Sequence, residues 1–501
     1  MKKTLCLFTL FFFVSAICFS STGIATEVNA DNVTYSKSLP VLFINTVDNA
    51  PIVSKEDYVD ATYYLETFGL NGYEAIGSEE EQFPLEIRGR GNASWANSDK
   101  KPYKLKLASK ESLMGMNKSK HFVLLAEVGG YTQFLTETAG MEMGKMIGLI
   151  WTPEIRPVEV VLNGDYIGLY LLTENVRVAE GRVDIYEQPD ESINPEEITG
   201  GWLVEIDNYD DPFQIKVDSK SGYTIRITHK SPEVLSLPQM EYLEEQIILL
   251  DKAICDEDST STDWEKWIDI DYLVRYYIVQ EILDNADAFH GSTYMYKEQG
   301  TDQKWIFGPL WDLGYSFWRE KDHFIYEESN YSHLVWIKEI ARYPNFQKKV
   351  REIWQEFYMQ RYNEIYDFID KLGEQCEQAD AADALRWPQY NKGGTISKCA
   401  TLKSLLKKNT DWLDSQWGVS ASTREALSSD RKVGIICGKG IISIETDKSI
   451  SDISLYDLSG IQLPVQNISD KSISISVRQG IYIVEISFSD GDIYRTCCWI
   501  K

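Results

Sequence analysis

The chain has 501 residues, 43% of them hydrophobic and 12% aromatic, and a formal net charge of −27 at pH 7. This length predicts two or three domains, and the apolar content is sufficient for a sizeable core. The negative charge argues against nucleic acid as a partner, because phosphates would be repelled over most of the surface. A nucleotide is still allowed, since a local group of lysines and arginines can bind phosphate.

Residues 1–25 have the layout of a secretory signal peptide. Lys2 and Lys3 precede an apolar run from about Leu5 to Phe19, and small residues follow. That run is short for a membrane span, and no other stretch is long and apolar enough to cross a bilayer. We therefore expect a secreted, periplasmic or cell-surface protein. An exported chain can form disulfides, and Cys376 with Cys399 is one possible pair, although spacing does not fix the connectivity.

Residues 38–175 predict an antiparallel β-sheet that carries one helix. Short strands fill residues 38–108, and one of them, residues 103–107, alternates between an apolar and a basic face. Apolar spacing predicts a helix over Thr132–Leu149. Two more strands, in residues 158–176, flank an Asn-Gly pair, which is a strong hairpin signal. The chain then leaves the sheet at Thr173–Asn175.

Further strands are expected in residues 200–229, and helices dominate residues 238–417. The helices are interrupted by a predicted hairpin, with Asp287 before its first strand and Asp312 after its second, so the two carboxylates should lie close together. Carboxylates with a nearby hydroxyl are hard oxygen ligands, suited to Mg²⁺ that holds a phosphate. Alternatively, the Asp, Asn and Gly residues are simply turn formers. Both interpretations remain open at this level.

A basic cluster stands out in this acidic chain: Arg88, Arg90, Lys100, Lys101, Lys104 and Lys106. Glycines beside the arginines let the backbone approach a ligand closely, so the cluster is a candidate phosphate site. The alternative is a solvated sheet face, which is common for a strand with alternating lysines. Glu137 and Glu142 lie on the following helix, where either can pair with one of these lysines. His290 is expected to have a structural hydrogen-bonding role.

Five segments carry a recognisable pattern: IRGRGNASW (87–95), KKPYKLKL (100–107), GDYIGLYLLTENV (164–176), DNADAFHGSTYMY (284–296) and WIFGPLWDLGYSF (305–317). In this order they resemble the CotH kinase family of atypical secreted kinases. The resemblance implies a two-lobed kinase-like fold, ATP with Mg²⁺ or Mn²⁺, and phosphoryl transfer to Ser or Thr of proteins. The chain departs from the family pattern at Ser292, where an Asn is common, and at Gly314, where a second Asp follows the first.

The resemblance also implies roles for individual residues. Asp287 would be the catalytic aspartate, and Asp312 would hold the metal together with Ser292. The phosphate-contacting lysine would be Lys101 or Lys104. The other expected nucleotide contacts are Glu142 as the partner of that lysine, Arg90 near the phosphates, and Glu174 in the hinge beside the adenine.

These observations predict an α+β protein with an atypical kinase-like domain. Its expected parts are an antiparallel β-rich N-lobe (38–175), a mainly helical C-lobe (176–418), a linker (419–432) and a small all-β sandwich (433–501). The last part resembles the C-terminal sorting modules of Bacteroidota-type secreted proteins. The leading functional hypothesis is an exported Ser/Thr kinase acting on a protein or cell-envelope component. The alternative is a catalytically silent surface protein that binds peptide or glycan.

Overall fold

A computed structural model describes residues 33–418, except 127, 131, 133, 212, 318, 328–333 and 391–392, and much of residues 433–500. The predicted signal peptide and linker lie outside the described residues. Backbone contacts divide the chain into two compact units, Met1–Asn409 and Thr410–Lys501. In the described residues, no helix is both long enough and apolar enough to cross a membrane.

The first unit begins with a closed seven-stranded barrel, whose strand order is β1-β2-β3-β4-β5-β7-β6. Its strands are β1 (Val41–Thr46), β2 (Val59–Glu66), β3 (Phe83–Gly89), β4 (Tyr103–Glu111), β5 (Ser119–Leu125), β6 (Ile155–Leu162) and β7 (Asp165–Glu174). The expectation of a wholly antiparallel sheet is wrong at one point, because β1 pairs with β6 in parallel. That pairing joins the two ends of the sheet and leaves no open edge.

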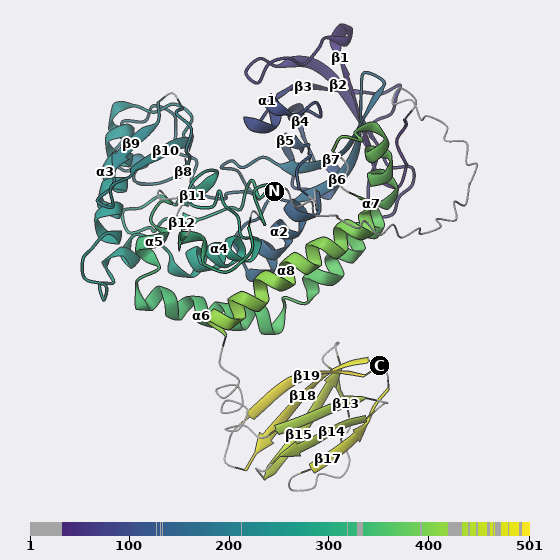
Figure 1. The fold of residues 1–501 in the computed structure, drawn as a ribbon, viewed down its shortest axis with the longest axis vertical. Coiled ribbons are helices and arrows are strands. Elements are labelled where there is room, and N and C mark those ends of the chain that lie inside the picture. Colours follow the sequence, from purple (N-terminus) through teal and green to yellow (C-terminus); the bar gives the residue numbers. More distant parts are fainter. Residues whose placement is uncertain are drawn as a thin grey trace, which may run out of the picture. The chain divides into compact units, whose positions relative to one another are not determined.

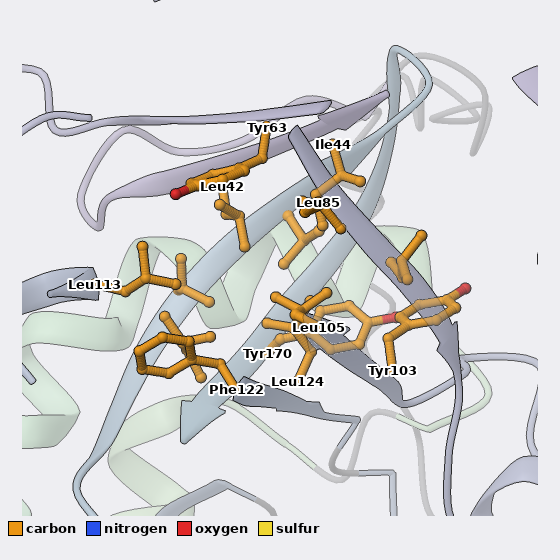
Figure 2. Packing of buried hydrophobic residues seen from close by; sticks show 14 of the residues in the cluster. Leu42, Ile44, Tyr63, Leu85, Tyr103, Leu105, Leu113, Phe122, Leu124 and Tyr170 are labelled. Atoms are coloured by element: carbon orange, nitrogen blue, oxygen red, sulfur yellow. The ribbon is translucent and has the colours of Figure 1, made fainter. Parts of the chain in front are cut away.

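Alternate side chains of the strands fill the barrel interior, and Figure 2 shows part of this packing. On β4, Tyr103, Leu105 and Leu107 face this core, so Lys104 and Lys106 lie on the outer face. The predicted Asn-Gly hairpin is confirmed between β6 and β7, with Asn163 and Gly164 both at positive φ. The outer face of β4 is therefore free to carry charge while its inner face stabilises the barrel.

Helix α2 (Phe134–Ile147) follows the barrel strands β1–β5 and confirms the helix expected at Thr132–Leu149. Helix α7 (Glu364–Arg386) packs against β7. There a buried ion pair joins the barrel to the helix, with Nζ of Lys100 2.7 Å from Oδ1 of Asp383. The same carboxylate oxygen accepts a 2.8 Å hydrogen bond from the Leu169 amide. The barrel is thus attached to the helical region by a buried charged group.

The remaining strands of the first unit form a five-stranded sheet in the order β12-β11-β8-β10-β9 (Figure 1). They are β8 (Trp202–Ile206), β9 (Ile215–Asp218), β10 (Thr224–Ser231), β11 (Thr293–Lys297) and β12 (Ile306–Phe307). The predicted hairpin is confirmed as the β11–β12 pair. The sequence did not predict that β11 also pairs with β8, which joins two distant segments in one sheet.

The remaining helices are α1 (Ala93–Asn97), which is in the barrel region, α3 (Leu237–Ile254), α4 (Ile270–Leu283), α5 (Ile337–Ile340), α6 (Pro344–Gln360) and α8 (Thr395–Trp417). Of these, α3 packs against β9 and α4 packs against β12 of the five-stranded sheet. Helix α3 begins with a capping box between Ser236 and Gln239. The sulfhydryl groups of Cys376 and Cys399 are buried and free, so the disulfide considered from the sequence is not formed.

The second unit contains two sheets, with strand orders β13-β14-β17 and β16-β15-β18-β19. Their bounds are β13 (Val433–Gly438), β14 (Ile441–Thr446), β15 (Ile450–Asp457), β16 (Gln462–Leu463), β17 (Ser472–Ser476), β18 (Gly480–Phe488) and β19 (Ile493–Ile500). Buried isoleucine, leucine and valine side chains from both sheets form one cluster. The alternating pattern after Lys432 thus yields strands that share a core.

Candidate active site

Two of the predicted site residues lie at the open end of the β11–β12 hairpin, because Asp287 precedes β11 and Asp312 follows β12. Helix α4 ends at Leu283, and the turn that follows carries the half-buried Asp287 toward β11. Asp312 follows β12, is exposed, and has φ 55°. Its Oδ2 lies 3.5 Å from Oγ of Ser292, within reach of a weak hydrogen bond. The structure therefore brings these three residues together.

The electrostatic environment of Asp287 favours its protonated form. Burial raises its pKa to about 6, and the negative charges of Asp312 and Asp207 add to that increase. A carboxyl group whose pKa is near neutral can accept a proton and release it again under physiological conditions. This property is typical of a general base, although structural carboxylate pairs show it as well.

Asp207 is a site residue that sequence reasoning missed. Thr293 of β11 pairs with Ile206 of β8, so Asp207 follows β8 at the level where Ser292 precedes β11. Oδ1 of Asp207 accepts hydrogen bonds from the amides of Asn208 (2.7 Å) and Tyr209 (3.3 Å). Burial raises the pKa of Asp207. The sequence feature that could have identified Asp207 is its position directly after an apolar strand. A carboxylate at such a position looks like an ordinary turn residue.

A buried ionic network holds the turn before Asp287. Nζ of Lys321 contacts the carboxylates of Glu281 and Asp284, at 3.0 Å from Oδ1 of Asp284, and all three side chains are fully buried. Arg319 adds a 3.2 Å contact to the same Asp284 oxygen. The amide of Ile325 donates to Glu281 at 3.0 Å. The segment after Asp312 is thereby attached to the end of α4, which fixes the turn that carries Asp287.

Helix α2 contacts the other side of the hairpin. The Leu313 amide donates a 2.9 Å hydrogen bond to Oε2 of the buried Glu137. A Cβ added to Gly140 would lie 2.2 Å from Cδ1 of Leu313 and 3.0 Å from Cδ1 of Leu283. Only a glycine allows this close approach without displacing its neighbours. Glu137 therefore positions the backbone next to Asp312.

The lysines of the basic cluster have different surroundings. Nζ of Lys101 donates to the Trp95 carbonyl at 2.7 Å and lies 5.4 Å from that indole ring's centroid. Lys100 pairs with Asp383 on α7. Lys106 is half exposed and pairs with Glu86 at 2.6 Å. Each of these three lysines already has a partner within the protein. Lys104, also on β4, has different surroundings.

Lys104 is surrounded by other cations. Burial lowers its pKa to about 8, and the charges of Arg88, Arg177 and Arg90 lower it further, against one opposing contribution from Glu233. Across the described chain, none of these four basic residues forms an ion pair with a carboxylate. Nε of Arg88 is buried and has no hydrogen-bond partner there. A group of unpaired cations with an orphaned donor is suited to bind an anion.

Arg90 connects this cationic group to the carboxylates. Its guanidinium carbon lies 5.6 Å from the ring centroid of Trp311, the residue before Asp312. Tyr294 of β11 is also within the electrostatic reach of Arg90. The turn after β3 thus faces the hairpin, and the phosphate-binding candidates lie on the barrel side of the site.

Glu142 and Glu174 do not contact Lys101 or Lys104. Glu142 is half-buried on α2 and lies 3.9 Å from Lys145 of the same helix. Glu174, at the end of β7, is completely buried, with Oε1 3.9 Å from Nε of Arg182 and Oε2 accepting the Glu154 amide at 2.9 Å. Burial raises the pKa of Glu174. Its side chain is therefore enclosed at the end of the barrel, and only its backbone is left to line a hinge.

A model of the CotH kinase protein family matches residues 87–413, about two thirds of the chain. The chain belongs to the CotH kinase family. The match begins in β3, just before the arginine-glycine turn, and ends within α8. It contains every candidate site residue and leaves the strands from β13 onward outside. No curated protein matches the chain.

Membership of the CotH kinase family suggests ATP and a divalent metal, and the side chains present suit both. The cations around Lys104 suit phosphate groups, and the buried Nε of Arg88 is a donor without a partner among the described residues. For the metal, the protein offers the carboxylate of Asp312 and the hydroxyl of Ser292, whose oxygens lie 3.5 Å apart. In the part of the chain that is described, no three His, Cys, Asp or Glu side chains group as a metal site. Mg²⁺ commonly takes one or two carboxylates and completes its shell with phosphate oxygens and water.

Proposed function

We propose that this CotH-family protein is an exported kinase that transfers phosphate from ATP to Ser or Thr of a protein or cell-envelope component. In this proposal the barrel is the N-lobe (38–175) and residues 176–418 are the C-lobe, with the nucleotide bound between them. The observation that carries the proposal is the half-buried Asp287, whose pKa is about 6, beside Asp312 and Ser292. A base of this kind can take the proton from an acceptor hydroxyl near neutral pH.

The residues of the chain divide the work between them. Asp287 would orient the acceptor hydroxyl and receive its proton at a carboxylate oxygen. Lys104, Arg88 and Arg90 would neutralise phosphate charge from the barrel side. Asp312 and Ser292 would hold Mg²⁺ or Mn²⁺, which supplies further neutralisation when bound. Most of the rate acceleration would come from positioning and electrostatics, because phosphoryl transfer requires little covalent assistance from the protein.

Nucleotide binding by the chain without its predicted signal peptide tests this proposal. Isothermal titration calorimetry with ATP, with and without Mg²⁺ or Mn²⁺, should show metal-dependent binding. Lys104→Met should weaken it by at least about tenfold, equivalent to 1.4 kcal/mol. Lys106→Met is the matched control, because Lys106 is on the same strand face but is exposed and paired with Glu86. Asp312→Ala should remove the metal dependence.

Transfer itself is measured with labelled ATP and dephosphorylated casein as a generic acceptor. Asp287→Asn should abolish labelling while leaving the affinity for ATP nearly unchanged. Absence of ATP binding under every metal condition would contradict the kinase proposal. In that event the alternative is a catalytically silent surface protein that binds peptide or glycan. Gly314, at the position of the family's second aspartate, favours this alternative.

A further inference from the structure

The loop between β8 and β9, residues 207–214, lies against the turn that carries Asp287. A Cβ added to Gly291 would lie 3.4 Å from Nδ2 of Asn208 and 3.8 Å from Oδ1 of Asp207. The negative charge of Asp207 also acts on Asp287. These contacts place the start of the loop, Asp207 and Asn208, beside the candidate catalytic turn.

The loop exposes two aromatic side chains. Phe213 is 82% exposed, the most exposed large hydrophobic side chain in the described residues, and Tyr209 is 50% exposed. Phe213 also has φ 63°, a backbone conformation that is unfavourable for a bulky residue. Water contact with an aromatic ring is unfavourable, and no local packing compensates for it here. Two exposed rings only four residues apart make this loop a candidate contact surface for a partner.

A third exposed aromatic residue lies on the other flank of Asp287. Tyr315 is 46% exposed, and its carbonyl accepts a 3.4 Å hydrogen bond from the Ala286 amide, directly before Asp287. We call these three exposed residues, Tyr209 and Phe213 on the loop after β8 and Tyr315 after Asp312, the aromatic rim. Aromatic residues of this kind are enriched at the centres of protein-recognition surfaces.

The charges around the rim indicate which peptide suits it. In the chain as described, Asp207, Asp211, Asp287 and Asp312 form no ion pair. Asp210 is different, because it pairs with Lys216 at 2.7 Å and with Arg226 at 3.4 Å. Asp207 and Asp211, which the proposed metal site does not use, favour a cationic partner, while the cations around Lys104 lie on the barrel side and suit phosphate.

We propose that the aromatic rim and the adjacent Asp211 bind the acceptor protein through an apolar side chain and a Lys or Arg close to the Ser or Thr that receives phosphate. That the bound protein is a phosphate acceptor rests on the proposed kinase function. The binding surface itself rests on the exposed rings and the unpaired carboxylates. The expected ligand is therefore a basic, partly apolar segment of polypeptide.

Binding of the full chain to an array of short randomised peptides, each with one Ser or Thr, tests the inference without ATP. The protein should retain peptides that combine Lys or Arg with an aromatic or branched aliphatic residue. Phe213→Ser and Tyr209→Ser should each weaken this binding by roughly tenfold and remove the apolar preference. Asp211→Asn should reduce the preference for Lys and Arg. Ile396→Ser is the matched control, because Ile396 is 78% exposed and lies on α8.

Equal binding by the wild type and the Phe213→Ser variant, or an equal loss in the Ile396→Ser variant, would overturn the inference. Selection of acidic peptides would overturn it as well. Calorimetry with ATP separates this result from the proposed function. Peptide selection without nucleotide binding would contradict the kinase function and support the peptide-binding surface. Nucleotide binding without peptide selection would support the kinase function and contradict the peptide-binding surface.

Discussion

Replacing Asp287 by asparagine should stabilise the protein while it abolishes phosphoryl transfer. Burial and two neighbouring carboxylates raise the pKa of Asp287 from 3.8 to about 6. A shift of roughly two units at 1.36 kcal/mol each sets an upper limit of about 3 kcal/mol on the cost of the charge. Because Asp287 is only half-buried, solvent screening reduces this, and we expect about 1–2 kcal/mol.

The raised pKa of Asp287 also predicts how the stability difference between wild type and variant changes with pH. Between about pH 4 and pH 6 the folded chain binds the Asp287 proton more tightly than the unfolded chain does. This contribution to stability is therefore lost as pH rises through that window. The asparagine variant should match the wild type near pH 4 and exceed it at pH 7.5.

Urea unfolding followed by tryptophan fluorescence measures the difference at each pH. Asp302→Asn is the control, because Asp302 is an exposed carboxylate on the loop between β11 and β12. It should change stability little at either pH. An Asp287→Asn variant that is equally stable or less stable than the wild type at pH 7.5 would refute the electrostatic reasoning.

Three further predictions concern the surroundings of the site. Lys321→Met leaves the Glu281 charge buried without its cation and should lower the free energy of unfolding by about 3–5 kcal/mol, whereas adding Glu281→Leu should restore much of it. Gly140→Ala should cost about 1–3 kcal/mol through its clash with Leu313, and Leu313→Ala in the same chain should recover part of that loss in a double-mutant cycle. Since the pKa of Lys104 is about 8, calorimetry should show ATP affinity falling above pH 8 as the amine loses its proton, and a flat profile would exclude Lys104 as the phosphate contact.

Local patterns in the sequence predicted local structure well. The Asn-Gly turn, the apolar spacing of α2 and the alternation on β4 each specify contacts between near neighbours. The barrel closure could not be predicted, because the parallel pairing of β1 with β6 joins segments more than a hundred residues apart. No short-range pattern encodes such a contact.

The same reason explains the result for the candidate site. Asp287, Ser292 and Asp312 belong to one hairpin, so their proximity followed from a local pattern. Asp207 was missed because it reaches the site through the pairing of β8 with β11. The partners of Lys101 and Glu142 also depend on tertiary packing. The sequence left Lys101 and Lys104 as equal candidates, and their surroundings in the fold distinguish them.

The buried pair of Lys100 and Asp383 has a consequence for motion. Rotating the barrel away from α7 would break this pair together with the hydrogen bond from the Leu169 amide to the same carboxylate oxygen. The barrel and α7 should therefore move together. Adjustment to different ligands would fall to the loops at the site rather than to a hinge between barrel and helices.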